Sequence, residues 1–181
     1  MPERIQVGSV QIVLFELTRP ADAVAYTAGD ALANSTSAAA VVPLSFPVAA
    51  EFDSRGKVIG ARLVTNSATA IASLRLWLFN IEPFAAAGYQ ADNAALALTY
   101  AAMTSGGATT SPKNNCIGYI DFTTFIARTG SSIGIGLSPQ TELEFALGPN
   151  DANLHGVLEV IAGFTPASAQ TFTVSLDIQV Q

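Results

Sequence analysis

The sequence predicts an all-β fold: a single-domain antiparallel β-sandwich or barrel, jelly-roll-like, with long loops and at most one or two short helices. Apolar residues recur at every second position in several segments, which is the period of a strand with one buried face. Clusters of Gly, Pro, Asn and Ser separate these segments at a spacing typical of sandwiches and barrels. The 181 residues suit one domain, residues 1–181, with residues 1–6 as a candidate N-terminal arm.

Residues 57–80, KVIGARLVTNSATAIASLRLWLFN, form the segment around which the predicted sheet is arranged. Two runs of β-branched and large apolar residues flank the small polar segment Asn66–Ala70. In each run one face of an extended chain is apolar. The residues that share these faces are Ile59, Ala61 and Leu63 in the first run and Leu74, Leu76 and Leu78 in the second. We interpret the two runs as a central hairpin or as a corner of a sheet.

The first third of the chain begins with a long predicted strand, Arg4–Leu17, or with a shorter strand preceded by an arm. The apolar alternation changes phase near Gly8–Ser9, where a bulge would exchange the two faces. The next segment, Ala23–Ala33, contains enough alanine for a helix, but Gly29 and Asp30 in its middle favour two short strands around a turn. We expect the turn.

Two further strands are expected before residue 66. Val41–Phe46 carries Pro43, which confines this strand to a sheet edge or to a strand start. The composition of Phe52–Gly56 is that of a hairpin turn, so we expect Val48–Phe52 to pair with Val58–Thr65.

Two long loops are predicted in the middle of the chain. Glu82–Asp92 is rich in Ala, Gly and Pro and cannot locally bury its aromatic residues Phe84 and Tyr89, so we expect these residues to face a partner. Ser105–Asn115 has no large apolar residue and is predicted to be a long loop. Between the loops, residues 92–103 fit either a capped helix or a strand, and the sequence leaves this alternative open.

Strands follow one another closely in the C-terminal third. The predicted segments are Cys116–Phe122, Ser132–Leu137, Thr141–Leu147, Leu154–Phe164 and Thr171–Val180. In the last of them Phe172, Val174, Leu176, Ile178 and Val180 face one way and polar residues face the other. Burial of each large apolar side chain contributes roughly 1.5–3 kcal/mol, so the pairing of this strand is essential to the fold.

Charged residues are sparse and mostly acidic. Only 12% of the residues are charged, against about 25% in an ordinary soluble domain, and the net charge is −6. The eight basic residues are scattered, which argues against nucleic-acid binding. A surface with so few charges leaves apolar patches that commonly become interfaces, so we expect an oligomer or a partner surface. No stretch resembles a membrane helix or a signal-peptide core, so we expect a soluble protein made in a cytoplasm, with no membrane partner.

No residue pattern typical of catalysis, a metal site or a cofactor site is found. His155 is the only histidine, and its place in a predicted strand favours a structural role over that of a general base. Cys116 opens an apolar strand and is expected to be a buried, unreactive thiol without an internal disulfide. Glu142 and Glu144 fit the exposed face of a strand, and Asp151 with its neighbours fits a turn better than a calcium loop. We therefore expect a protein that is not an enzyme.

Two arginines and the only tryptophan lie in the central strands. Arg62 and Arg75 are expected to face outward or to pair with an acidic residue across the sheet, although arginine is also common at interfaces. Trp77 fits an interface anchor and an ordinary core residue equally well.

Four stretches together resemble a known family. They are AYTAGDALAN at 25–34, SLRLWLFNIEP at 73–83, DNAAL at 92–96 and FTPASAQTFTVSLDIQVQ at 164–181. Their order resembles that of the decoration, or cement, proteins encoded beside the major capsid gene of tailed bacteriophages. The likeness extends over about residues 25–181 and includes no catalytic or ligand signature.

The resemblance implies a non-enzymatic β protein of the virion that needs no cofactor. Its partners would be the major capsid protein and further copies of itself, as a homotrimer or, as second choice, a homodimer. It would bind the outside of the assembled capsid where capsomers meet, and it would stabilise the shell against the pressure of the packaged DNA.

Candidate contacts come from segments that lack the apolar density to pack on their own domain. These segments are Pro2–Gln6, Pro83–Gln90 and Ser105–Asn115. With the central strands they give the candidate capsid or subunit contacts Pro2, Glu3, Arg4, Arg62, Arg75, Trp77, Phe84, Tyr89 and Lys113.

A second class of function is compatible with the sequence: a tail-fibre or other receptor-binding β-sandwich that binds glycans. Such a module would need exposed aromatic residues in a groove, and the chain has one Trp and four Tyr. The two functions can be separated, because a cement protein co-sediments with capsids and a glycan-binding module does not need them.

Overall fold

Strands make up most of the described chain. The computed structural model describes residues 10–48, 54–69, 73–84, 89–98, 115–136, 142–148 and 151–180. Within these ranges the only helical segment is a single 3-10 turn, η1 (Ala38–Ala40). The strands are β1 (Val10–Thr18), β2 (Ala31–Leu32), β3 (Leu44–Pro47), β4 (Arg55–Thr65), β5 (Ser73–Phe79), β6 (Cys116–Phe122), β7 (Phe125–Arg128), β8 (Ser131–Ile135), β9 (Leu143–Ala146), β10 (Asn153–Ala162) and β11 (Thr171–Val180).

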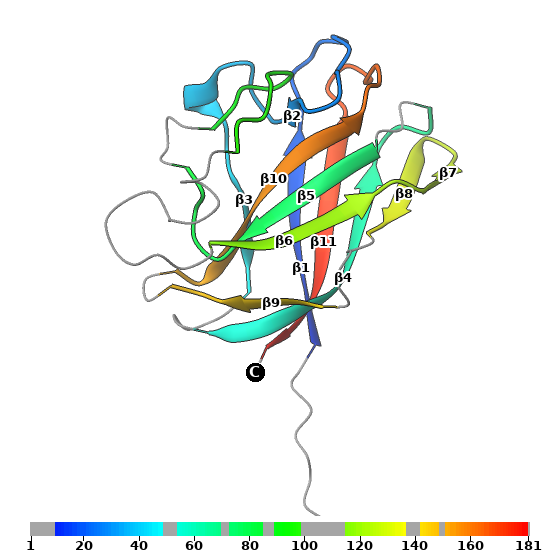
Figure 1. Cartoon of the computed structure of the whole chain (residues 1–181). Coiled ribbons are helices and arrows are strands. Elements are labelled where there is room, and N and C mark those ends of the chain that lie inside the picture. Colours follow the sequence, from blue (N-terminus) through cyan, green and yellow to red (C-terminus); the bar gives the residue numbers. More distant parts are fainter. Residues whose placement is uncertain are drawn as a thin grey trace, which may run out of the picture.

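The strands form two antiparallel sheets that pack face to face (Figure 1). Sheet A has the order β1-β11-β4-β8-β7, and β9 shares with β8 the far edge of β4. Sheet B has the order β2-β10-β5-β6, and β3 shares with β2 the same edge of β10. In Figure 1 the strands β10, β5 and β6 lie in front of β1, β11 and β4 and cross them at an angle.

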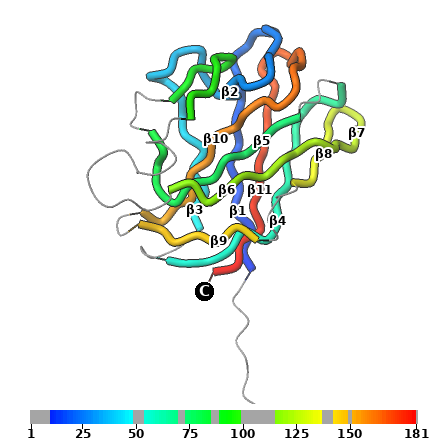
Figure 2. The backbone as a smooth tube through the Cα atoms, viewed as in Figure 1, coloured from blue at the N-terminus to red at the C-terminus, as the bar shows by residue number. Residues whose placement is uncertain are grey.

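The pairing is nested from the ends of the chain inward. The first strand pairs with the last, β2 and β3 pair with β10, β4 pairs with β8 and β9, and β5 pairs with its neighbour β6. Figure 2 shows the first and last strands, blue and red, running side by side. A chain that rolls up in this way, with successive pairs placed alternately in two sheets, is a jelly roll. The predicted jelly-roll-like sandwich is confirmed, whereas the barrel alternative is wrong because the two sheets stay separate.

The centre of the core comes from β11, which lies between β1 and β4. Its side chains Phe172, Val174, Leu176 and Ile178 are no more than 1% exposed, as the alternation predicts. Val180, expected on the same face, is only partly buried because it lies at the end of the strand. The inward leucines of β5 belong to the same continuous hydrophobic cluster, which fills the space between the sheets.

The segment 57–80 forms a corner and not a hairpin. β4 lies in sheet A and β5 in sheet B, so the chain passes from one layer to the other between them. The expected pairing of Val48–Phe52 with Val58–Thr65 is also wrong in its described part. The backbone N–H of Val48 donates to the carbonyl oxygen of Ala152 at 3.1 Å, next to β10, whereas β4 pairs with β11, β8 and β9. The composition of Phe52–Gly56 does not show that β3 and β4, on either side of it, lie in different sheets.

A bulge in β4 changes which of its residues face the core. Between Val58 and Gly60 the register with β11 shifts by one residue, which leaves Ile59 without a partner on that strand. The alternation predicts Ile59 on the inward face together with Leu63. Leu63 is indeed fully buried, but Ile59 is 43% exposed and Val58, at 3%, takes the core position.

The strands of the C-terminal half overlap their predicted segments, with one addition. β6 and β11 have the predicted bounds, and β8, β9 and β10 are slightly shorter or shifted. β7 is not predicted from the sequence; it forms a hairpin with β8. The turn between them includes Gly130, whose φ of +74° lies in the region that favours glycine.

The predicted turn in 23–33 is present and lies beside residues 92–98. Gly29 has a φ of +93°, and the N–H of Leu96 donates to the carbonyl oxygen of Gly29 at 2.8 Å. Within the described residues only one short strand, β2, accompanies this turn, where two were expected. Residues 92–98 form neither a helix nor a regular strand; an isolated bridge between Asp30 and Ala95 joins them to the turn.

Parts of several predictions lie outside the described residues. They are the start of the first predicted strand with its phase change at Gly8–Ser9, residues 49–53 of the expected hairpin, residues 85–88 of the first loop, residues 99–103 of the open segment and residues 105–114 of the second loop.

Alanine substitutions in β4 test the bulge. Ile59→Ala should lower the free energy of unfolding by less than about 1 kcal/mol, because this side chain lies largely in solvent. Leu63→Ala in the same strand should lower it by about 2–5 kcal/mol, because it opens a cavity in the core. Urea denaturation followed by circular dichroism gives both values. Equal losses would mean that β4 alternates without interruption.

Candidate interaction surfaces

The outer face of sheet B is partly covered by the chain's own loops. Phe79, Tyr89 and Val157 form a second, small hydrophobic cluster there, and the Phe84 ring packs edge-on against Tyr89 with centroids 5.1 Å apart. Tyr89 is only 5% exposed within the chain, which argues against the expectation that this residue faces a partner. Its apolar partners come from β5 and β10, which the local sequence does not reveal. Burial and the carboxylate of Glu82 raise the pKa of the Tyr89 hydroxyl.

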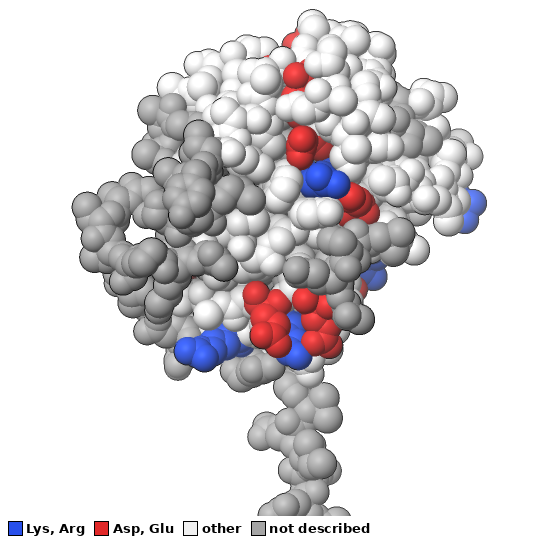
Figure 3. Space-filling view, in the orientation of Figure 1, with Lys and Arg blue, Asp and Glu red and all other residues white. Residues whose placement is uncertain are grey.

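Next to this cluster the same face carries a group of interacting polar and aromatic side chains. Arg75 donates to both carboxylate oxygens of Asp121, at 2.7 and 2.9 Å, and its guanidinium lies 3.9 Å from the centre of the Tyr119 ring. Trp77 donates from Nε1 to Glu159 at 2.7 Å, and its ring centroid lies 5.1 Å from that of Tyr119. These contacts tie β5 to β6 and β10. Figure 3 shows few other charges in the middle of this side of the molecule.

The outer face of sheet A carries most of the exposed apolar side chains. Of the ten large apolar residues that are exposed in the described part of the chain, seven belong to sheet A strands. They are Val10, Ile12 and Leu14 of β1, Ile59 and Val64 of β4, Ile126 of β7 and Ile135 of β8, with exposures of 39–62%. Cross-strand partners project to the same side of a sheet, so the register places all of these residues except the unpaired Ile59 together on the outer face.

Two apolar strips flank a polar centre on this face. The β1 strip consists of Val10, Ile12 and Leu14, and the β7–β8 strip consists of Ile126, Ile133 and Ile135. Between them β11 presents Thr, Ser and Asp side chains, and Arg62 of β4 forms an ion pair with Asp177 of β11. The face is therefore polar along β11 and apolar at its two margins, and β4 between them carries Arg62 together with the exposed Ile59 and Val64.

The predicted contact residues do not form one site. Arg62 lies on the outer face of sheet A, whereas Arg75 and Trp77 lie on the outer face of sheet B, on the opposite side of the sandwich. Both arginines pair with an aspartate on a neighbouring strand, which confirms one of the two interpretations of these residues. Phe84 and Tyr89 belong to the hydrophobic cluster on sheet B. The positions that lie outside the described residues are Pro2, Glu3, Arg4 and Lys113.

Sequence reasoning misses the apolar margins of sheet A, although β1 contains a signal for them. Both alternating sets of residues in Val10–Phe15, VQIVLF, are largely apolar. A strand that faces the core on one side and water on the other normally alternates apolar with polar residues. Because neither face of this stretch is polar, the pattern indicates that the outer face of β1 contacts more than solvent.

No relative helps to choose between the two faces. Comparisons of the chain with models of protein families, with curated proteins and with solved structures find no match. The assignment of function therefore rests on the chain's own residues.

The residues considered for catalysis make structural contacts. His155 is buried, and its Nε2 lies 2.6 Å from Oδ2 of Asp151. The other carboxylate oxygen of Asp151 accepts the N–H of Asn153 at 2.9 Å, which is the turn that the sequence predicts. Cys116 is partly buried, and burial raises the pKa of its thiol, so the nucleophilic thiolate is disfavoured.

The acidic pair near β9 is a solvated face, as expected. Glu142 and Glu144 are exposed, and Lys57 of β4 lies 2.6 Å from the first carboxylate and 3.4 Å from the second. In the part of the chain that the structure describes, no group of three or more His, Cys, Asp or Glu is placed to hold a metal ion. The same ranges contain no helix of the length and apolarity needed to cross a bilayer.

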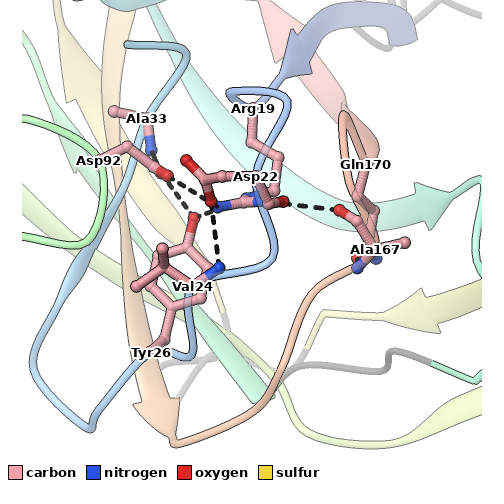
Figure 4. A network of polar contacts seen from close by, with 8 residues as sticks. All are labelled: Arg19, Asp22, Val24, Tyr26, Ala33, Asp92, Ala167 and Gln170. Atoms are coloured by element: carbon pink, nitrogen blue, oxygen red, sulfur yellow. Dashed lines mark hydrogen bonds and ion pairs between the residues drawn. The ribbon is translucent and has the colours of Figure 1, made fainter. Parts of the chain in front are cut away.

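A buried arginine joins three loops at one end of the sandwich (Figure 4). Arg19 follows β1 directly and is 1% exposed. Its guanidinium forms ion pairs with Asp22 at 2.6 Å and Asp92 at 3.2 Å, and its Nε donates to the Tyr26 hydroxyl at 3.0 Å. It also donates to the carbonyl oxygen of Ala167 at 3.4 Å, in the loop before β11.

Asp92 completes this network. Its carboxylate accepts the Tyr26 hydroxyl at 2.6 Å and the N–H of Ala33 at 2.8 Å. Burial raises the pKa of Asp92 above its ordinary value, so its ionised form depends on these donors and on the Arg19 cation. The network connects the loop between β1 and β2, the segment around residue 92 and the loop before β11, which is a structural role.

Substitution of the buried arginine tests this role. Arg19→Met should lower the free energy of unfolding by about 3–5 kcal/mol, because it leaves the Asp92 carboxylate buried without its cation. Arg128→Met, at an exposed arginine, is the control and should change it by less than about 0.5 kcal/mol. Combining Arg19→Met with Asp92→Asn should recover part of the loss. Urea denaturation of the single and double variants measures the coupling, and strictly additive losses would show that the two groups do not interact.

Proposed function

We propose that the chain is a capsid decoration, or cement, protein of a tailed bacteriophage. In this role it is a non-enzymatic protein of the virion, and its partners are the major capsid protein and further copies of itself. It binds the outer surface of the assembled capsid at the junctions between capsomers. Because it binds the assembled shell and not the dissociated subunits, it stabilises the shell by mass action against the pressure of the packaged DNA.

The observation that carries this proposal is the outer face of sheet A. Its exposed Val, Leu and Ile side chains leave apolar surface in water at a cost of roughly 25 cal/mol per Å², and apolar patches of this kind commonly mark interaction surfaces. The face is a sheet surface, so it suits a broad protein partner better than a small ligand, which normally binds in a concave pocket. The Arg62–Asp177 ion pair in its centre supplies polar groups for such a contact.

The fold supports the proposal only by analogy. Jelly rolls occur in viral capsid domains and also in lectins. A fold does not determine a function, so the surface chemistry and the sequence resemblance carry more weight. Weak contacts with several capsid subunits would add through effective concentration, without one tight site.

A glycan- or receptor-binding module is the second candidate, because one observation favours it. Trp77 and Tyr119 lie next to each other on the outer face of sheet B, where aromatic rings can stack on a sugar. However, Arg75 lies over Tyr119, and Trp77 is bonded to Glu159, so a sugar would have to displace these contacts. A glycan array probed with the whole protein tests this function. Binding that Trp77→Ala abolishes would favour it over the capsid role.

Co-sedimentation with purified, expanded capsids of the phage that encodes the chain tests the proposed function. The wild-type protein at micromolar concentration should pellet with the capsids. Ile135→Glu introduces a charge into the β7–β8 strip and should weaken binding at least about tenfold, because the charge would be buried in an apolar contact. Val24→Glu is the matched control, since Val24 is similarly exposed at 54% but lies outside sheet A, and it should bind like the wild type.

Each outcome of this experiment has a distinct meaning. A wild-type protein that stays in the supernatant is not a cement protein. A protein that pellets equally well with Ile135→Glu and with Val24→Glu binds capsids through another surface. Both variants should keep the melting temperature of the wild type, because both positions are exposed.

A further inference from the structure

We propose that the free edge of β1 pairs with β1 of a second copy of this chain. The two strands run antiparallel about a two-fold axis next to Ile12, and they join two copies of sheet A into one continuous sheet. The contact is made by the backbone of β1 together with the side chains of the β1 strip.

β1 has an edge that no other described strand pairs. Within the described ranges it is hydrogen-bonded as a strand to β11 alone. β3 of the other sheet and the residue after it lie close to β1: Gln11 Nε2 donates to the backbone carbonyl oxygen of Val48, and the Phe15 and Phe46 rings meet edge to face. Among the residues that the structure describes, no strand other than β11 pairs with β1, and its outer edge is unoccupied by them.

The hydrogen-bond pattern shows which residues face this edge. Just beyond β1, the N–H of Arg19 donates to the carbonyl oxygen of Gln170 at 3.1 Å, in the register of the β1–β11 ladder. Hydrogen-bonded and non-hydrogen-bonded pairs alternate along an antiparallel ladder. The odd-numbered residues of β1 therefore bond to β11, and the backbone groups of Val10, Ile12 and Leu14 point to the free edge.

The composition of this edge favours pairing. Val10, Ile12 and Leu14 are 57%, 62% and 61% exposed, and the stretch 10–15, VQIVLF, contains no charge, proline or glycine. Exposed edge strands are normally protected by Lys, by Pro, by a bulge or by short length. β1 contains no Lys, Pro or bulge, its nine residues pair with β11 without a shift in register, and its one charged residue, Glu16, lies outside the stretch 10–15.

The other edges of the two sheets are protected in ways that β1 is not. In sheet A, β7 has four residues and ends in Arg128. In sheet B, β2 has two residues and β3 has four, and β6 carries a register shift in its pairing with β5. Among the described strands β1 therefore provides the longest uninterrupted edge.

Two-fold symmetry makes this edge complementary to itself. With the axis at Ile12, that residue faces Ile12 of the partner subunit, and Val10 faces Leu14 of the partner subunit. All outward pairs in the centre are then apolar, which stabilises neighbouring strands, and each facing pair can exchange two backbone hydrogen bonds. Glu16 is the only charged residue of β1, and this register places it and Glu16 of the partner subunit at opposite ends of the paired segment, so like charges do not meet.

The inference names the surface for the contact between copies that the proposed function includes, and it does not depend on binding to a capsid. The pairing forms in the free protein, with no capsid present. A two-fold contact uses the β1 edge of both copies, so it produces a dimer, and a trimer would need a different contact. The β7–β8 strip at the other margin of sheet A is not used in this pairing and stays available to another partner.

Analytical ultracentrifugation of the whole chain tests the pairing. The wild-type protein, with a monomer mass of 18.7 kDa, should sediment as a dimer at micromolar concentration. Ile12→Pro removes an edge N–H that β11 does not use, so this variant should keep its circular dichroism spectrum while its dimer dissociation constant rises at least about tenfold. Ile12→Val keeps the N–H and should stay dimeric. A monomeric wild type overturns the inference, and so does a dimeric Ile12→Pro.

Disulfide cross-linking tests the register and does not require Ile12→Pro to fold. In a Cys116→Ser background, Ile12→Cys should form an intermolecular disulfide, because facing Cα atoms in a hydrogen-bonded pair lie about 5.5 Å apart. Ile135→Cys is the matched control, since Ile135 is also 62% exposed on the same face, and it should cross-link far less. Equal cross-linking at the two positions overturns the pairing. Dimers that fail to bind capsids would overturn the proposed function alone.

Discussion

The ladder that joins β11 to β1 on one side and to β4 on the other is the constraint on which the rest of the structure depends. It brings the two ends of the described chain together, and the strands between them add nested pairs, β2 and β3 with β10, β4 with β8 and β9, and β5 with β6. The side-chain period of β11 also fixes the register, because a slip by one residue would move its buried Phe, Val, Leu and Ile side chains to the outer face. A fold built on such distant pairings is held by long-range contacts and not by local propensity, so we expect it to form slowly.

The same architecture gives the two outer faces different properties. On sheet B, residues between β5 and β6 return to the sheet, where Tyr89 closes a small second core, and Arg75, Trp77 and their partners satisfy one another. On sheet A the outward side chains of β11 are polar, and exposed Val, Leu and Ile side chains lie on β1, β4, β7 and β8. Because the chain has few charged residues, it cannot cover both outer faces with them. The face that keeps exposed apolar side chains is therefore the candidate interaction surface.

The sequence predicts the features of this protein that depend on alternation within one strand. The bounds of Thr171–Val180 and Cys116–Phe122 follow from it, as do the inward leucines of β5. The sequence does not predict features that depend on the contacts between one strand and its neighbours. The bulge at Ile59 is a property of the β4–β11 pair, and the burial of Tyr89 depends on side chains of β5 and β10. For the same reason the sequence does not predict which outer face of the sandwich carries which side chains, because this depends on the register of the strands.

An unprotected edge such as β1 is a hazard for a monomer, because it can pair with any exposed strand. Pairing with its own copy removes the hazard and gives the assembly a two-fold axis, and a symmetric ligand binds best where its target has matching symmetry. A dimer joined through β1 would carry two β7–β8 strips related by that axis, so both strips could engage capsid subunits only at a position with true or local two-fold symmetry. The gain from two linked contacts is lost wherever geometry prevents both from forming. The edge of one strand would thus decide which capsomer junctions the protein can occupy, whereas a trimer would select three-fold positions.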